Sequence, residues 1–318
     1  MRRRDLTLIA LVCVVLAAGL TWTNAALVGK IRWEDRLAMH SQILTNQAPA
    51  PMQTDSLLVA HLTQGLNELT GVSLGVWFIA AWGFGYLVAL GGCAFWLGQV
   101  FRDRGRVTLG LSAAACYAAI MLASSYHHTQ DPYAVGLFAL CLGLMVRNKL
   151  PAVVLVALAA GFLWDKQVLL GPVVGLYLVQ RGEWRRGVGW GLLATLAAAV
   201  GPVAYRLVLG PHAQWANGYA ATLGGQLHLL PMTAGRHLVL LGLPLLGLFA
   251  APGRVPLALW CATLVYPAMI VVYLALGMIL FEARSFWIAV PAFAAFTALL
   301  VQDSRTERVT SAPGGRSA

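Results

Sequence analysis

The sequence predicts an all-α membrane protein built as a bundle of about ten transmembrane helices, and three observations point to that fold class. Hydrophobic residues make up 59% of the 318 residues and charged residues only 11%, with a mean hydropathy of +0.73. The apolar segments are long and continuous, as membrane-spanning helices require, and lack the alternation of barrel strands. Arginine and lysine gather in alternate connections between these segments.

The apolar segments follow one another from Leu6 to Val301 with no polar stretch long enough for a separate soluble module. We therefore expect one membrane domain, residues 1–301, with an outer loop at 29–71. The tail at 302–318 is rich in Ser, Thr, Arg and Gly, which predicts a disordered cytoplasmic segment. The predicted spans are 6–28, 72–101, 107–123, 133–146, 150–164, 168–179, 188–209, 238–251, 255–280 and 286–301.

The fifth and sixth of these spans, 150–164 and 168–179, are short. A helix rises about 1.5 Å per residue, so each would barely cross a hydrocarbon layer about 30 Å thick. We expect these two spans to form a tight hairpin that carries the intervening charges, Asp165 and Lys166, into the protein, because either charge would be costly against lipid.

The distribution of basic residues predicts the orientation, since arginine and lysine near span ends stay in the cytoplasm. Arg2, Arg3 and Arg4 place the amino terminus there. With the predicted spans the whole net charge of +10 falls on the cytoplasmic face, whereas basic and acidic residues balance on the outer face. We expect a multi-pass protein of the cell (inner) membrane with both termini cytoplasmic, whose basic charge attracts membrane lipids and not nucleic acid.

The first span has a second interpretation as a secretory signal, because arginines followed by an apolar stretch also begin signal peptides. Its apolar run is longer than the roughly 7 to 15 residues typical of a signal, which favours an uncleaved anchor. Cleavage near Asn24 stays open and would not change the later topology.

Most of the candidate site residues fall on the predicted outer side, where polar chemistry gathers at or near span ends. Ionisable residues near membrane depth usually face a bundle interior or an aqueous cavity and are site candidates. The candidates are Glu34, Asp35, His127, His128, Asp131, Asp165, Lys166, Glu282 and Arg284.

Each candidate also has a structural interpretation. Asp165 and Lys166 could form an ion pair, and Arg284 could pair with Glu282 or reach the membrane surface. The adjacent His127 and His128 suggest a divalent cation, but neighbouring histidines rarely chelate together. Lining of an outer cavity is favoured, and a simple interfacial position stays open. The cofactor is left unassigned, and an amphipathic helix at 33–44 could simply anchor itself in the headgroup layer.

Several short motifs resemble those of the GT-C superfamily, the multi-spanning glycosyltransferases that use polyprenyl-phosphate-linked sugars. An acidic helical pattern, Trp33-Glu34-Asp35-Arg36, follows the first span and precedes a proline turn. Asp131-Pro132 opens the fourth span, Trp164-Asp165-Lys166 supplies a charged pair, and Glu282-Ala283-Arg284 precedes the last span. The resemblance implies a GT-C-like fold and catalysis at the outer leaflet, with an outer-loop carboxylate, Asp35 beside Glu34, as general base on the acceptor hydroxyl.

Glycosyl transfer needs a base within reach of a hydroxyl and cations that stabilise the leaving phosphate. Asp35 could supply the base, and Lys166 and Arg284 could hold a lipid phosphate. A transporter or lipid flippase is the second hypothesis, in which buried charges line a path across the membrane. A noncatalytic membrane scaffold is the third hypothesis.

Overall fold

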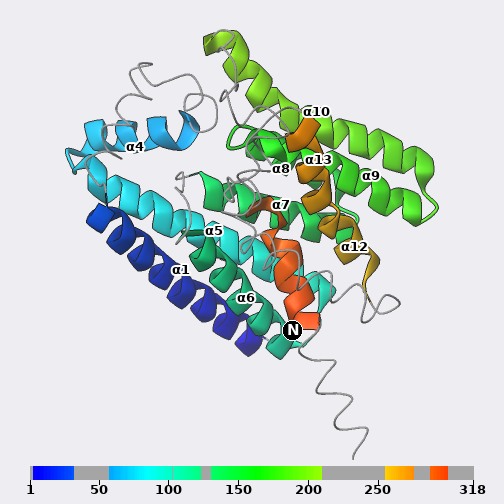
Figure 1. Cartoon of the computed structure of the whole chain (residues 1–318), viewed down its shortest axis with the longest axis horizontal. Helices are drawn as coiled ribbons and strands as arrows, with labels where there is room; N and C mark the ends of the chain where they lie inside the picture. The colour runs from blue at the N-terminus through cyan, green and yellow to red at the C-terminus, as the bar shows by residue number, and fades with distance from the viewer. Residues whose placement is uncertain are drawn as a thin grey trace, which may run out of the picture.

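The computed structural model describes residues 3–31, 57–101, 103–122, 130–209, 255–275 and 287–299, and within these ranges every regular element is helical. This confirms the all-α fold class (Figure 1). The elements are α1 (Arg3–Ile31), α4 (Leu57–Thr70), α5 (Leu74–Val100), α6 (Arg104–Leu122), α7 (Asp131–Val146), α8 (Leu150–Gly161), the 3-10 helix η1 (Asp165–Leu169), α9 (Leu170–Gln180), α10 (Trp184–Leu209), α12 (Leu257–Thr263) and α13 (Val265–Ala275). A further helical segment, Trp287–Leu299, follows.

Among the described residues, three helices are long and apolar enough to cross a membrane: Arg4–Ala26, Leu74–Val100 and Trp184–Tyr205. This is fewer than the ten predicted spans. Most of the other predicted segments are helices that are shorter or less apolar, and the span predicted at 238–251 lies outside the described residues. The shorter apolar helices are Asp131–Val146, Leu150–Gly161, Leu257–Val271 and Trp287–Leu299.

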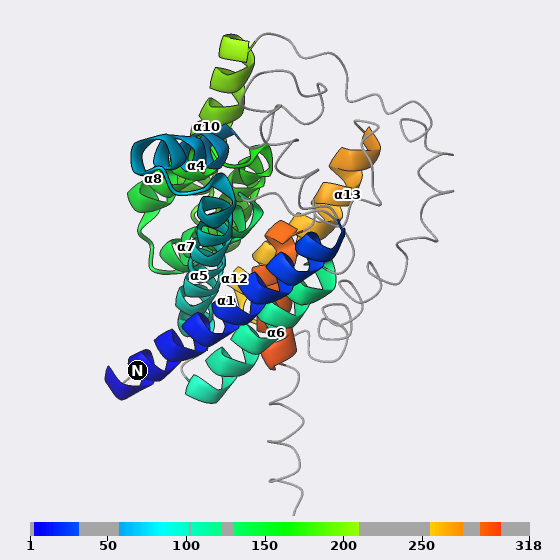
Figure 2. The ribbon, with the colours of Figure 1, turned by 90° about the vertical axis from the view of Figure 1, so that its left-hand side faces the viewer.

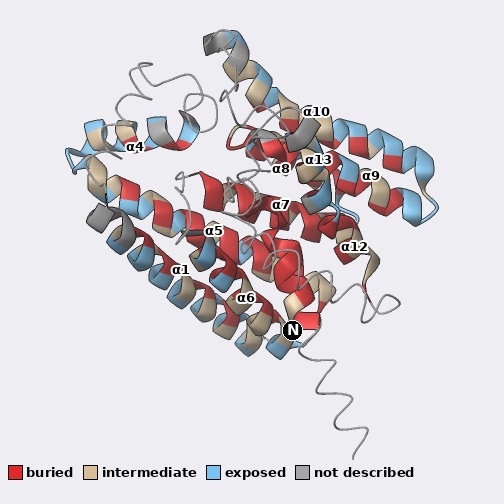
Figure 3. Ribbon diagram, in the orientation of Figure 1, coloured by how far each residue is buried: buried red, intermediate tan, exposed pale blue. Residues whose placement is uncertain are grey.

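The outward faces of α1 and α10 are apolar, which is what lipid-facing helices require. Trp22 of α1 is 77% exposed and Leu207 of α10 is 80% exposed. Figure 3 shows exposed residues along one side of each helix and buried residues where the helices meet. An aqueous protein rarely exposes contiguous apolar surface of this extent. The other exposed apolar residues on these two helices are Leu6, Leu11, Val14, Val15, Trp184, Val188, Leu192, Leu193, Leu196, Val200 and Val203.

The span predicted as one helix at 255–280 is broken in the structure. Helix α12 ends at Thr263, Leu264 forms a turn, and α13 begins at Val265. Pro267 explains the break, because it has no N–H to donate to the carbonyl of Thr263, four residues earlier. The hydroxyl of Thr263 donates to Leu259 O at 2.7 Å and so closes the last turn of α12.

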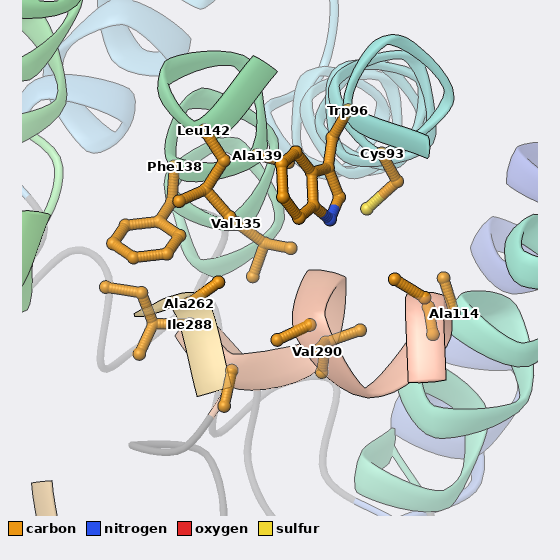
Figure 4. Packing of buried hydrophobic residues seen from close by; sticks show 14 of the residues in the cluster. Cys93, Trp96, Ala114, Val135, Phe138, Ala139, Leu142, Ala262, Ile288 and Val290 are labelled. Carbon is orange, nitrogen blue, oxygen red and sulfur yellow. The ribbon is translucent and has the colours of Figure 1, made fainter. Parts of the chain in front are cut away.

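The core lies between α5, α7 and the segment 287–299 (Figure 4). Trp96 of α5 is fully buried, and its indole Nε1 donates to the carbonyl of Pro291 at 3.2 Å. Phe138 of α7 and Ile288 pack into the same cluster. The indole bond joins residues far apart in sequence without leaving a polar atom unsatisfied among apolar side chains.

Helices α5 and α7 pack through glycines that let their backbones touch. A Cβ on Gly92 would lie 2.8 Å from the carbonyl carbon of Gly136, and one on Gly136 would meet the backbone at Val88 and Ala89. A Cβ on Gly85 would meet the ring of Tyr133, whose hydroxyl donates to Ala81 O at 2.7 Å. Small residues at such crossings are typical of helix packing in membranes, where close van der Waals contact drives association.

Helices α8 and α9 each pack on α10, again through small residues. A Cβ on Gly161 of α8 would lie 3.0 Å from the Cα of Ala198, and one on Gly171 of α9 would lie 2.8 Å from the amide nitrogen of Thr195. The two predicted short helices are therefore present, but each packs on α10 and they do not pack tightly on each other as the predicted hairpin would. The first of them ends at Gly161 instead of residue 164, because Trp164 adopts an extended backbone (φ −160°) that leads into η1.

The connections rich in arginine meet at one end of the bundle, the basic end. Arg104 at the start of α6 contacts Asp5 of α1 at 3.3 Å. Arg147, after α7, donates to Gln99 near the end of α5 at 2.9 Å. Figure 2 shows α1 and α6 side by side, both starting at this end.

The turn between α9 and α10 joins the same network. Arg186 of α10 donates through Nη2 to Asn148 Oδ1 at 3.3 Å and through Nη1 to Glu183. Exposed ion pairs of this kind add little to the stability of the fold, so they are useful here only as evidence of which connections lie close together. They show that these connections, which the sequence predicts to be cytoplasmic, lie together at one end of the bundle. Helices that run in alternating directions along the chain, as α1 and α5 to α10 do, place every second connection at the same end.

We expect cysteines at opposite ends of the bundle to differ in labelling by an impermeant thiol reagent in intact cells. Cysteine at Glu68 on α4 should react, whereas cysteine at Lys149 at the basic end or at Ser304 should not, because basic connections stay in the cytoplasm. Exposed Cys116 is first replaced by alanine to remove background labelling. Labelling of Ser304 from outside would contradict the even number of spans.

Candidate functional site

Four buried polar side chains lie in two segments that a hydrogen bond joins, the start of α7 and the 3-10 helix η1. Gln130 and Asp131 are each 1% exposed, Lys166 is 7% exposed and Gln167 is fully buried. Lysine and aspartate are almost never buried to this extent unless a partner compensates the charge. We call these four residues the polar cluster.

One hydrogen bond holds the two halves of the polar cluster together. The amide Nε2 of Gln167 donates to the backbone carbonyl of Ala134 at 2.8 Å, one turn after Asp131 in α7. The other amide atom, Gln167 Oε1, is buried and accepts no hydrogen bond from the part of the chain that the structure describes. An acceptor of this kind is available to a hydroxyl or amide donor.

The local backbone explains why these residues reach the interior. Pro132 stands in the first turn of α7, where its missing N–H costs nothing, so the helix begins at Asp131. On the other side, the extended residue Trp164 ends α8, and the backbone amide of Gln167 donates to Trp164 O at 3.3 Å to form η1. The chain thus turns within the bundle and presents Lys166 and Gln167 inward.

Lys166 lies against an aromatic ring. Its Nζ is 4.8 Å from the ring centroid of Trp164, which is itself only 2% exposed. Attraction between a cation and an indole ring reaches about 2 kcal/mol when both are shielded from water. This contact offsets part of the cost of burying the ammonium group.

Helix lengths give the distance between the polar cluster and the basic end. Helix α7 has 16 residues between Asp131 and the basic end, a rise of about 24 Å. Helix α8 has 12 residues and rises about 18 Å from the same end. Helix α5, with 27 residues, is about 40 Å long and extends well past Asp131.

The polar cluster therefore lies roughly 18 to 24 Å from the basic end, measured along α8 and α7. The sequence places Asp131 and Lys166 at the outer boundary of the membrane, and this placement stays a prediction. Helix α7 starts at Asp131 and α8 ends at Gly161, so both helices are shorter than α5.

Two of the predicted site residues, Asp131 and Lys166, are described and buried, one at the start of α7 and one in η1. The hydrogen bond from Gln167 to Ala134 joins these two segments. Asp165 belongs to η1, but its side chain is outside the described part of the chain. The remaining predicted residues lie outside the described ranges, so their arrangement stays a prediction: Glu34, Asp35, His127, His128, Glu282 and Arg284.

Sequence reasoning missed three residues of this site: Gln130, Trp164 as the partner of Lys166, and Gln167. A glutamine directly beside each predicted charge, within otherwise apolar sequence, was the available signal. An amide is seldom placed in a membrane domain without a hydrogen-bonding task.

No group of three potential ligands among His, Cys, Asp and Glu occurs within the described ranges. The divalent-cation interpretation rested on His127 and His128, which are outside those ranges. The described cluster instead combines one carboxylate, one ammonium group and two amides, a set that suits an anionic or hydroxyl-bearing ligand.

Comparison with known proteins gives no match of any kind: no family model, no curated protein and no solved structure is similar to this chain.

Proposed function

We propose that this protein is a GT-C-like membrane glycosyltransferase with about ten spans, and that it transfers a sugar from a polyprenyl-phosphate donor at the outer face. It acts in the cell (inner) membrane with both termini in the cytoplasm. The observation that carries the proposal is the burial of two opposite charges, Asp131 and Lys166, in segments joined by the hydrogen bond from Gln167 to Ala134. Ionisable residues buried inside a membrane bundle are retained mainly for function.

A lipid-linked donor suits a buried cation of this kind. Its phosphate lies near the membrane boundary and its hydrocarbon tail lies among the lipids, so a cation buried near that boundary can reach the phosphate from within the bundle. Lysine binds phosphate as a point charge with three donors. Lys166, together with Arg284, holds the lipid phosphate in this proposal.

The remaining roles follow from residue chemistry. Asp35, beside Glu34 in the outer loop, acts as general base on the acceptor hydroxyl. Asp131, with His127 and His128, binds sugar hydroxyls, for which the buried Gln167 Oε1 provides a further acceptor. Asp165 and Glu282 orient the two cations.

Transport of a lipid or solute is the second candidate, and the burial of Asp131 and Lys166 inside the bundle favours it specifically. A transporter holds its substrate at a buried polar site between helices. Transport requires a polar path to the basic end as well. The described residues between the polar cluster and the basic end, such as Ala139, Leu142 and Val153, are buried and apolar.

The test uses purified protein in liposomes with a panel of labelled polyprenyl-phosphate sugars, and it measures release of polyprenyl phosphate. Wild type should turn over at least one donor, and Lys166→Met should raise KM for that donor because the phosphate loses a cation. Lys149→Met is the matched control, since Lys149 is exposed at the basic end, and it should behave as wild type.

Lys166→Arg separates charge from packing, because it keeps the cation and should retain donor binding better than Lys166→Met. A Lys166→Met protein that folds and binds donor normally would exclude Lys166 as a phosphate ligand. Movement of labelled lipid between leaflets without release from any donor would favour transport instead.

A further inference from the structure

Helix α4 has an apolar arc that no described part of the protein covers. Val59 and Thr63 are buried and define the face toward the bundle. Glu68 and His61 are exposed, and Glu68 accepts a hydrogen bond from Gln64 at 2.7 Å on a polar face. Between these faces lie four leucines spaced three or four residues apart, the leucine arc: Leu58 (40% exposed), Leu62 (57%), Leu66 (37%) and Leu69 (83%).

The joint between α4 and α5 fixes the position of this arc. Gly71 has φ +69°, a left-handed conformation that favours glycine, and it turns the chain between the helices. Asn67 Nδ2 donates to Val72 O at 2.8 Å, and Trp77 Nε1 of α5 donates to Thr70 Oγ1 at 3.1 Å. These bonds hold α4 beside the first turn of α5, at the end of the bundle away from the basic end (Figures 1 and 2).

The leucine arc continues into surface that faces lipid. Exposed apolar side chains resume at Val72 (40%), Val76 (53%) and Ile79 (38%), which lead into the candidate span α5. Helix α5 is about 40 Å long, longer than the hydrocarbon core of about 30 Å, so its first turns reach the membrane boundary. A helix fixed there with adjoining apolar and polar faces meets the requirements of an interfacial helix.

We propose that α4 is an interfacial helix whose leucine arc inserts into phospholipid at the outer boundary of the membrane. The sequence Leu57–Thr70 contains no lysine or arginine, so acyl chains and not anionic headgroups supply the attraction. The inference does not depend on glycosyl transfer, because it follows from burial and position alone.

The test compares two neighbouring residues on different faces of α4. Single cysteines at Leu62, on the leucine arc, and at His61, on the polar face, are introduced with Cys116→Ala, labelled with bimane and reconstituted in phosphatidylcholine vesicles. Lipids brominated at different acyl positions should quench bimane at Leu62, with a depth of about 5–10 Å below the headgroups. Bimane at His61 should be quenched by aqueous iodide and not by brominated lipid.

Two results would overturn the proposal. Quenching of the Leu62 label by iodide alone would place the arc in water. Resistance to both quenchers would place it against protein, either another segment of this chain or a second copy, and dilution into excess lipid would distinguish these two. If Leu62→Cys elutes abnormally, Leu69→Cys serves in its place, because Leu69 is 83% exposed and packs against little else.

Discussion

Valine at Gly92 should prevent accumulation of folded protein, whereas valine at Gly91 should leave it nearly unchanged. The two glycines are neighbours in α5, so both substitutions change helix propensity alike. A Cβ on Gly92 would lie 2.8 Å from the carbonyl carbon and 2.9 Å from the Cα of Gly136, whereas one on Gly91 would meet nothing within 4 Å. The difference between the two variants therefore isolates the α5–α7 contact.

The expected effect is large because the obstacle is backbone. Adding methylenes to a packed core typically costs about 1–3 kcal/mol when side chains can shift. Here the facing residue is Gly136, which has no side chain to move, so the helices must separate. Separation would also pull Trp96 away from Pro291 O and loosen the contact with the segment 287–299.

The measurement is size-exclusion chromatography of the solubilised variants, followed by thermal unfolding of any monodisperse fraction. Gly92→Val should give little monodisperse protein or a much lower Tm, and Gly91→Val should match wild type. Equal yields and equal Tm values for the two variants would show that α5 and α7 do not approach as closely as the structure places them.

The sequence predicted the helices well because apolar run length carries that signal directly. The segments 107–123, 133–146 and 188–209 correspond closely to α6, α7 and α10. The two short helices α8 and α9 were predictable because residues 150–179 contain charge at their middle, but their separate packing on α10 was not. Run length does not report helix breaks inside an apolar stretch. The break at Leu264 followed from Pro267, whose effect on a buried helix depends on what neighbours can compensate.

The site was predictable in part. Asp131 and Lys166 were recognisable as costly charges, but their burial depends on where α7 starts and α8 ends, which hydropathy fixes only within a few residues. Gln167 was not predictable as the link to α7, because its partner, the carbonyl of Ala134, belongs to an unremarkable apolar turn. Pairing between helices depends on how small residues pack in three dimensions. A single sequence does not say which small residues of two helices face each other.

The largest effect on activity is expected for Asp35→Asn, which should lower kcat for sugar transfer by about 10² to 10⁴. Asparagine keeps the shape of aspartate but cannot take a proton from the acceptor hydroxyl. The donor should still bind, because the proposal assigns phosphate binding to Lys166 and Arg284. KM for the lipid-linked sugar should therefore change little, in contrast to Lys166→Met, which should raise KM.

Asp55→Asn is the matched control, since Asp55 is another carboxylate of the same outer loop and has no role in the proposed reaction. It should retain wild-type turnover, and all variants should elute and melt alike, which separates loss of the base from loss of the fold. Equal kcat in wild type and Asp35→Asn would exclude Asp35 as the base. Asp131 would then become the carboxylate to replace next, because it is the one that the structure places, buried, in the same cluster as Lys166.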